Sequence, residues 1–270
     1  MTRIAHISDI HFGREDPVVV EGLLADLFNA APDVIVVSGD LTQRAKKSQF
    51  RAAREFLDRL PAVPRMVVPG NHDVSATNLV ERALRPLARF RRYISPDLAP
   101  FLVVEDVAIV GINTVRTLKR KDGRISARQV REACAQLASA PKAAVRVVVT
   151  HHPMDLPAAD LTNAVVRRAA MAMETFAEAG VDLFLSGHLH AGLTLATTAR
   201  YRLPGYSAIV VHAGTAVSTR TRRVPNSWNL LRVNAANIAI EQRVWRETAF
   251  NAGAAESYRR GNDGWVRSSS

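Results

Sequence analysis

The chain has 270 residues, of which 47% are apolar and 23% are charged, proportions typical of a globular protein. Its formal net charge of +11 indicates either attraction to an anionic partner (a phosphorylated small molecule, a nucleic acid or a membrane surface) or simply a well-solvated surface. The single cysteine, Cys134, excludes an intrachain disulfide, and no apolar run approaches the roughly 20 residues of a membrane-spanning helix. A strand pattern begins almost at Met1 and leaves no room for a signal peptide, so we expect a cytoplasmic protein.

Up to about residue 190 the chain alternates apolar strands with amphipathic helices, as α/β proteins do. Strands are predicted at about 3–8, 34–37, 66–68, 101–104, 107–112, 145–150 and 182–186, and helices at about 18–30, 46–60, 126–139 and 164–179. Pro86 should divide the helical pattern of 75–100, and Ser126 with Gln129 fits a capping box. Residues Glu105 and Asp106 should form the tight turn between two of the strands.

Beyond His190 the pattern is β throughout, at about 193–197, 208–213, 227–233 and 237–246. No helices separate these strands, so we expect them to add antiparallel pairs to a second sheet. Residues 1–250 should form a single domain, and the polar residues 251–270 a flexible tail.

Polar clusters follow five of the apolar strands. They are Asp9-Ile10-His11, Gly39-Asp40, Gly70-Asn71-His72-Asp73, His151-His152 and Gly187-His188-Leu189-His190. Ligands of open α/β sheets bind at the carboxyl ends of strands, so five such ends would converge on one polar pocket. Carboxylate, imidazole and amide groups without thiolates suit divalent ions such as Mn²⁺, Fe²⁺ and Zn²⁺.

These motifs, in this order, resemble those of the calcineurin-like metallophosphoesterases, and the compact length and His11 are most similar to the bacterial cyclic-nucleotide phosphodiesterase branch. The resemblance implies a four-layer α/β/β/α sandwich of two mixed sheets flanked by helices, with two divalent metal ions (Mn, Fe or Zn) at the strand ends. It assigns Asp9, His11 and His190 to one ion and Asn71, His151 and His188 to the other, with Asp40 bridging both. A carboxylate suits the bridging position because one of its oxygens can face two cations, which an imidazole nitrogen cannot do.

The resemblance also implies an enzyme that hydrolyses a phosphodiester by attack of a metal-bridging hydroxide. His72 would protonate the leaving alkoxide, with Asp73 fixing the His72 ring and raising its basicity.

Several further polar residues have two interpretations each. His6 and His212 lie inside predicted strands and are expected to be packing residues. His152 is expected to be a supporting residue, with contact to the substrate as the alternative. Arg44 could reach a phosphate or form a surface ion pair, and Asn113 with Thr114 could line the pocket. The arginines of segment 82–92 form either a solvated stripe or a patch that faces phosphate or lipid.

The substrate stays open at this stage. A small phosphodiester, such as a cyclic nucleotide or a glycerophosphodiester, is favoured over a DNA or RNA substrate because only 6% of the residues are aromatic and no basic groove is evident. A UDP-sugar-lipid pyrophosphatase, in which segment 82–92 would contact the membrane peripherally, is a further alternative. A non-catalytic scaffold is disfavoured because every motif ligand is present. Monomer and homodimer both stay open.

Overall fold

The computed structural model describes residues 1–75, 79–116, 122–157, 165–197, 200–201, 203–220 and 224–268. The strands are β1 (Thr2–Ile7), β2 (Val34–Val37), β3 (Arg65–Val67), β4 (Phe101–Val104), β5 (Val107–Ile112), β6 (Val145–Thr150), β7 (Leu183–Ser186), β8 (Leu193–Ala196), β9 (Ile209–His212), β10 (Ser227–Val233), β11 (Asn237–Arg246), β12 (Ala249–Gly261) and β13 (Gly264–Arg267). The α-helices are α1 (Pro17–Ala30), α2 (Lys47–Arg59), α3 (Leu79–Leu84), α4 (Ala88–Tyr93), α5 (Ala127–Ala138) and α6 (Ala169–Glu178), and Asn71–Asp73 forms a 3₁₀ turn.

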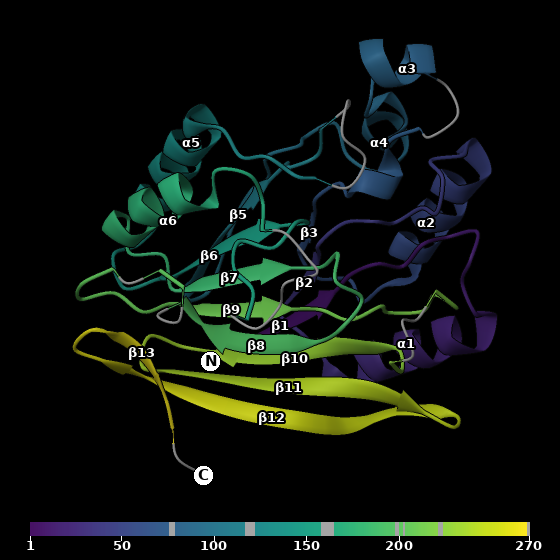
Figure 1. Cartoon of the computed structure of the whole chain (residues 1–270). Coiled ribbons are helices and arrows are strands. Elements are labelled where there is room, and N and C mark those ends of the chain that lie inside the picture. The colour runs from purple at the N-terminus through teal and green to yellow at the C-terminus, as the bar shows by residue number, and fades with distance from the viewer. Residues whose placement is uncertain are drawn as a thin grey trace.

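Two mixed sheets form the centre of the molecule (Figure 1). The first has the strand order β13-β12-β11-β10-β1-β2-β3, and the second has the order β4-β5-β6-β7-β9-β8. Strands β1, β2 and β3 are mutually parallel, as are β5, β6, β7 and β9. The carboxyl ends of each parallel group therefore lie along one edge of its sheet.

Alternating apolar side chains on the strands explain the layers. Val34 and Val36 of β2 pack with Val147 and Val149 of β6 in the core between the sheets. Ile35, one position along, points the other way and packs in the core that also holds buried side chains of α1 and α2. The outer face of the second sheet packs against α5 and α6. The predicted four-layer α/β/β/α sandwich is confirmed.

Most local predictions in the first part of the chain are confirmed. Ser126 and Gln129 form the capping box that begins α5. The helical pattern around Pro86 is divided into α3 and α4, and Glu105 adopts a left-handed φ of 47° in the turn between β4 and β5.

The predicted helix over 164–179 begins later than expected, at Ala169. Arg167 forms a parallel bridge with Arg124, and Arg168 then turns the chain with a φ of 70°. The extended backbone at Arg167 keeps this stretch out of the helix, and the first expected residue, 164, lies outside the described residues.

The prediction that the late strands join a second sheet is correct for β8 and β9 and wrong for the others. Strand β10 pairs antiparallel with β1, with Leu231 opposite Ile4, and β11, β12 and β13 extend the first sheet from there. The alternation of apolar residues reveals which face of a strand is buried but not which strand lies beside it.

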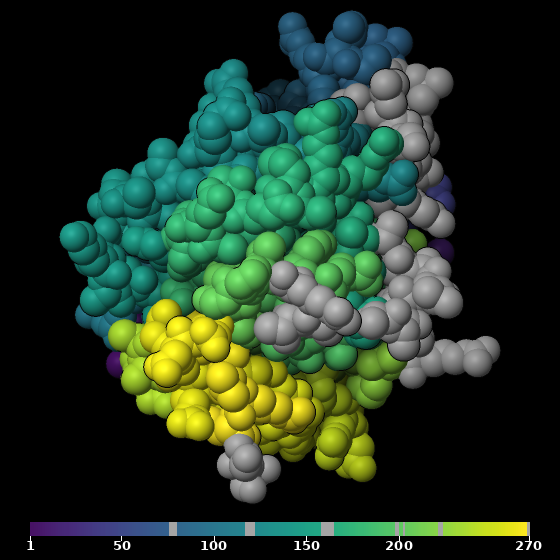
Figure 2. Space-filling model, turned by 60° about the vertical axis from the view of Figure 1, so that its left-hand side comes forward, coloured from purple at the N-terminus to yellow at the C-terminus, as the bar shows by residue number. Residues whose placement is uncertain are grey.

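The prediction of a flexible tail over 251–270 is also wrong for the described residues, since β12 and β13 continue the sheet to Arg267. Phe250, Tyr258 and Trp265 are buried, and the Trp265 indole N–H donates to Asp182 at 2.9 Å. Figure 2 shows this C-terminal segment, in yellow, packed against the rest of the molecule. Its composition is polar because most of its side chains are solvent-exposed, so a few aromatic residues anchor it.

Within the described residues, none of the helices combines the length and the apolar character needed to cross a bilayer.

Candidate metal centre

The predicted ligands converge where the carboxyl ends of the parallel strands of both sheets meet. Asp9 follows β1, Asp40 follows β2 and Asn71 follows β3, all in the first sheet. His151 follows β6, and His188 and His190 follow β7, both strands of the second sheet. Neither sheet alone could therefore form the site.

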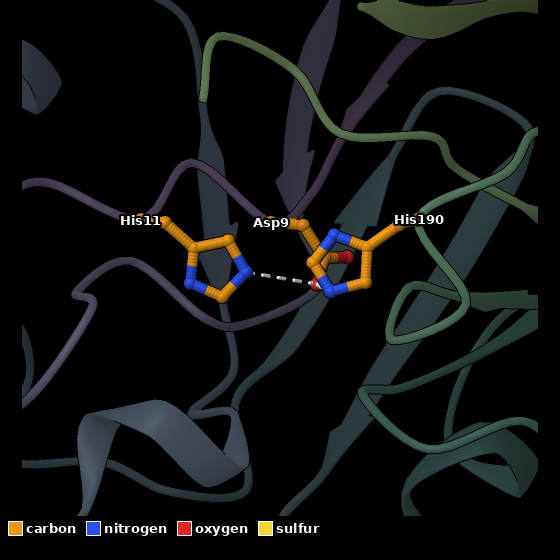
Figure 3. Close-up of side chains that lie close together, drawn as sticks. All are labelled: Asp9, His11 and His190. Atoms are coloured by element: carbon orange, nitrogen blue, oxygen red, sulfur yellow. Dashed lines mark ion pairs between the residues drawn. The ribbon is translucent and has the colours of Figure 1, made fainter. Parts of the chain in front are cut away.

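Asp9, His11 and His190 form the first cluster (Figure 3). The Oδ1 atom of Asp9 lies 3.5 Å from Nε2 of His11 and 3.7 Å from Nε2 of His190, and the two imidazole rings are stacked with centroids 5.1 Å apart. The three side chains are buried. The Nδ1 atom of His190 is hydrogen-bonded to the Thr215 hydroxyl at 2.8 Å, which orients Nε2 of this ring toward Asp9.

Asn71, His151 and His188 form the second cluster. The Asn71 Oδ1 atom lies 3.1 Å from Nε2 of His151 and 3.0 Å from Nδ1 of His188. The Nδ1–H of His151 donates to the carbonyl of Ser38 at 2.8 Å. This hydrogen bond turns Nε2 of His151 toward the cluster, the arrangement found around metal-binding imidazoles.

Asp40 lies between the two clusters. Its Oδ2 atom is 3.8 Å from Nε2 of His11 in the first cluster and 3.4 Å from Nε2 of His151 in the second. Its Oδ1 atom accepts a hydrogen bond from the backbone N–H of His72 at 2.8 Å. The carboxylate therefore faces both clusters from one fixed position.

The buried polar atoms of the site fit a bound cation. Asp9, His11 and His190 can each offer one ligand atom, as can Asp9, Asp40 and His151, and within each group these atoms all lie within 4.8 Å of one another. Among the described residues, the Asp9 Oδ1 atom and both ring nitrogens of His11 are buried without a hydrogen-bond partner. Such groups are costly to bury without a partner. A divalent ion would bind lone pairs of the Asp9 oxygen and of a His11 nitrogen, which the protein itself leaves without a partner.

The electrostatics of the site also favour a cation. Burial opposes ionisation of Asp40, but His151 outweighs it and holds the pKa of this carboxyl well below its usual range. Burial likewise opposes protonation of His151, but the Asp40 carboxylate raises the pKa of His151 to about 9. The carboxylates thus favour positive charge at this site, and a metal ion can supply that charge in place of a proton.

The backbone is unusual at the same positions. Asp9, His11, Asp40, His188 and His190 all have a positive φ, between 52° and 73°. Residues other than glycine adopt this region rarely, and such conformations cluster at functional sites. At Gly70, a Cβ atom would lie 2.1 Å from Oδ1 of Asp40, so only glycine allows this turn to approach the carboxylate.

A family model described as calcineurin-like phosphoesterase matches residues 2–192, a span that contains both clusters. The chain belongs to the calcineurin-like phosphoesterase family. Among its relatives, the glycerophosphodiester phosphodiesterase GpdQ of Enterobacter lignolyticus is 31% identical over an alignment of 126 residues, with 40% of this chain and 44% of that enzyme covered. This phosphoesterase chain thus matches less than half the length of that curated relative.

Solved structures agree on the calcineurin-like phosphoesterase fold. Purple acid phosphatase PPD1 from yellow lupin (Lupinus luteus) seeds aligns with a TM-score of 0.70 at 12% identity, covering 95% of this chain and 53% of the lupin chain. A dimetal phosphatase from Danio rerio aligns with a TM-score of 0.62 at 13% identity, covering 92% of this chain and 98% of the fish chain. At these identities the likeness concerns the fold alone.

His72 lies beside the first cluster, with its ring centroid 4.9 Å from that of His11. Its Nδ1–H donates to the carbonyl of Gln43 at 2.8 Å, and its Nε2 accepts a hydrogen bond from Nη1 of Arg220 at 2.8 Å. Burial lowers the pKa of His72, although the Asp40 carboxylate and the hydrogen bond to Gln43 oppose this shift. Sequence analysis missed Gln43 and Arg220, since neither belongs to a strand-end motif.

The predicted contact between Asp73 and the His72 ring is wrong. Asp73 accepts hydrogen bonds from the backbone N–H groups of Leu41, Thr42 and Gly70 and from the Thr42 hydroxyl, at 2.9 to 3.2 Å. These bonds tie the 3₁₀ turn to the loop after β2, so the carboxylate shapes the loops that carry Asp40 and Asn71. The carbonyl of Gln43 takes the role that the sequence suggested for Asp73.

The other candidates occupy different environments. His152 is buried and hydrogen-bonded to the Thr114 hydroxyl at 2.8 Å, as a supporting residue would be. His6 bonds to the Ser38 hydroxyl at 2.9 Å and His212 to the Ser186 hydroxyl at 2.7 Å, both inside the core. The Asn113 side-chain oxygen accepts from the backbone of Val115, and Arg44 is exposed.

The arginine segment 82–92 borders a separate open groove of about 610 Å³ between α2, α3 and α4. Its lining residues include Arg85, Arg89 and Arg92 but none of the predicted metal ligands. Arg89 is ion-paired with Glu81 and donates to the carbonyl of Ala45, so this arginine is part of the local structure.

Proposed function

We propose that this chain is a metal-dependent phosphodiesterase that hydrolyses a small phosphodiester. The observation that carries the proposal is the position of Asp40, whose carboxylate faces a histidine of each cluster. Two ions held in this way would together form a dinuclear centre. Relatedness to a glycerophosphodiester phosphodiesterase supports a diester over a monoester.

Asp9, His11 and His190 would hold one ion, and Asn71, His151 and His188 the other, with Asp40 between them. Mn²⁺, Fe²⁺ and Zn²⁺ all suit this set of oxygen and nitrogen ligands. When bound, such a pair of ions activates a water molecule for attack on phosphorus and neutralises charge on the phosphate oxygens.

His72 is the residue best suited to supply a proton to the leaving oxygen. Its Nδ1–H is held by the Gln43 carbonyl, so Nε2 is the atom available for proton transfer. The ring lies beside the first cluster, with its centroid 4.9 Å from that of the His11 ring. Once Nε2 has taken up a proton from solvent, its transfer to the leaving alkoxide avoids release of a strong base into the site.

The substrate class is the finer part of the proposal. A 3′,5′-cyclic nucleotide or a glycerophosphodiester is a monoanionic diester small enough for a site formed by strand ends. We propose a cytoplasmic location. Cys134 is the single cysteine and cannot form an intrachain disulfide, which fits a reducing compartment.

The test is a comparison of substrates with the Mn²⁺-loaded protein and Asp40→Ala as the blank. Cyclic AMP, glycerophosphocholine, bis-p-nitrophenyl phosphate, a nucleotide-sugar pyrophosphate and single-stranded DNA are assayed side by side. Efficient turnover of cyclic AMP or glycerophosphocholine supports the proposal. Preferential cleavage of DNA or of the pyrophosphate would overturn the substrate class while leaving the metal chemistry intact.

A further inference from the structure

Arg220 is hydrogen-bonded to Nε2 of His72, the atom that the proposed reaction needs. A guanidinium group can only donate hydrogen bonds, so the 2.8 Å contact from its Nη1 makes Nε2 of His72 an acceptor. The other ring nitrogen already donates to Gln43. As long as this contact persists, Nε2 cannot donate to the oxygen of a leaving group.

The backbone that carries Arg220 is firmly anchored. The Arg220 N–H donates to the Ser218 hydroxyl at 3.1 Å, and Ser218 forms an antiparallel bridge with Glu15. The adjacent N–H of Thr219 donates to the carbonyl of Arg14 at 2.8 Å. These bonds tie the loop after β9 to the loop after β1, which carries His11. The position of Arg220 beside the site is therefore built into the fold.

The Arg220 residue is exposed, in contrast to the buried ligands around it. Its side chain can therefore change partner without disturbing the core, while hydrogen bonds to Ser218 and Arg14 hold the backbone of residues 219 and 220 in place. A partner that displaces it from His72 must be a better acceptor than an imidazole nitrogen. An anionic phosphate oxygen is such an acceptor, and the planar guanidinium matches it with two donors.

We propose that Arg220 binds a non-bridging oxygen of the phosphodiester and, by moving to it, leaves Nε2 of His72 open to take up a proton from solvent and pass that proton to the leaving oxygen. This inference rests on the proposed function and assigns its substrate-phosphate contact to a residue outside the strand-end motifs. In this arrangement the anionic substrate itself exposes the proton-transfer atom.

The first measurement is the dissociation constant of inorganic phosphate for the Mn²⁺-loaded protein, compared among wild type, Arg220→Ala and Arg220→Lys. Loss of a charge-assisted hydrogen bond should weaken binding by about 10- to 100-fold in Arg220→Ala. Arg220→Lys should recover part of this loss, because lysine keeps the positive charge but lacks the paired N–H donors of the guanidinium group. Arg51→Ala, which removes an equal charge from the exposed face of α2, should leave binding unchanged.

The second measurement separates a phosphate contact from an effect exerted only through His72. The kinetics of bis-p-nitrophenyl phosphate hydrolysis are compared for Arg220→Ala in the wild-type and His72→Ala backgrounds. A phosphate contact predicts that KM rises by about 10- to 100-fold in both backgrounds. A change that disappears in the His72→Ala background would overturn the inference.

Failure of the inference differs from failure of the proposed function. Equal phosphate affinity in wild type and Arg220→Ala, with diester hydrolysis by the wild type, overturns the role of Arg220 alone. Phosphate binding that depends on Arg220, without hydrolysis of any diester by the wild type, overturns the phosphodiesterase proposal and supports the anion contact.

Discussion

Oδ2 of Asp40 lies 3.4 Å from Nε2 of His151, and this contact joins the loop after β2 in the first sheet to the end of β6 in the second. Residues 111 positions apart in the sequence thus share one buried contact at the junction of the sheets. The same carboxylate faces His11 on its other side. The arrangement makes Asp40 the residue on which both proposed metal positions depend.

Asp40→Asn should therefore lose both metal binding and activity. The amide keeps the shape of the side chain but removes the negative charge that would balance two cations. Elemental analysis of the purified variant after loading with Mn²⁺ should find less than one ion per chain. Asp58→Asn on α2, which removes an exposed carboxylate that is paired with Arg54, is the matched control and should keep full metal content. Two bound ions in Asp40→Asn would contradict the bridging role.

His72→Ala should keep its metal but lose activity in a way that depends on the leaving group. No ligand of either cluster is removed, so elemental analysis should match the wild type. General acid catalysis contributes about 10²–10⁴ in rate, and this loss should appear with alkoxide leaving groups rather than with p-nitrophenolate. The measurement is kcat/KM over a series of diesters whose leaving groups differ in pKa. A uniform loss across the series would argue against proton transfer from His72.

Asp73→Asn should reduce stability rather than change the dependence on the leaving group. Asp73 accepts four hydrogen bonds, and an amide group would direct its own N–H toward at least one of those donors. The free energy of unfolding should fall by about 2–4 kcal/mol, measured by urea denaturation. If Asp73→Asn kept its stability but behaved like His72→Ala in the leaving-group series, the result would support the original prediction that Asp73 orients His72.

Trp265→Ala should destabilise the protein, because β13 is part of the sheet. The side chain is 2% exposed, and its indole N–H donates to Asp182. Truncating a buried tryptophan costs about 3–5 kcal/mol, so the midpoint of urea unfolding should fall markedly. Val266→Ala is the control, since Val266 is 49% exposed on the same strand and its truncation should cost little. Equal stability of both variants would favour the flexible tail that the composition suggested.

Asp155 should make the stability fall as pH rises between about 4 and 6. Burial raises the pKa of this carboxyl from 3.8 to about 6, although Arg200 pairs with it at 2.8 Å. The folded protein therefore holds a proton that the unfolded chain has released, and the stability from this proton is lost as pH rises through the folded pKa. The unfolding free energy of the wild type minus that of Asp155→Asn should fall by up to about 3 kcal/mol from pH 4 to 6.5. A difference that is constant over this range would contradict the shift.

The sequence alone was sufficient for the parts of the protein that local patterns encode. Apolar β-branched runs such as 34–37 predicted buried strands, and Ser126 with Gln129 marked the start of α5, because these signals act within a few residues. The polar residues after the strands also predicted one pocket, and the family resemblance of their motifs grouped Asp9, His11 and His190, which the structure brings together. Parallel strands in one sheet end at the same edge, so local order accounts for the nearness of Asp9 and Asp40, whereas bringing His190 to them required the two sheets to pack together.

The tertiary structure decided the relationships that depend on which segments become neighbours. Strand β10 could have joined either sheet by its alternation of side chains, and only its pairing with β1 placed the C-terminal strands in the first sheet. Asp73 adjoins His72 in the sequence, yet its carboxylate binds the loop after β2, while Gln43 and Arg220, 29 and 148 positions from His72, contact the imidazole. Hydrogen bonds of buried groups are fixed by the folded backbone around them, and adjacency along the chain does not specify that environment.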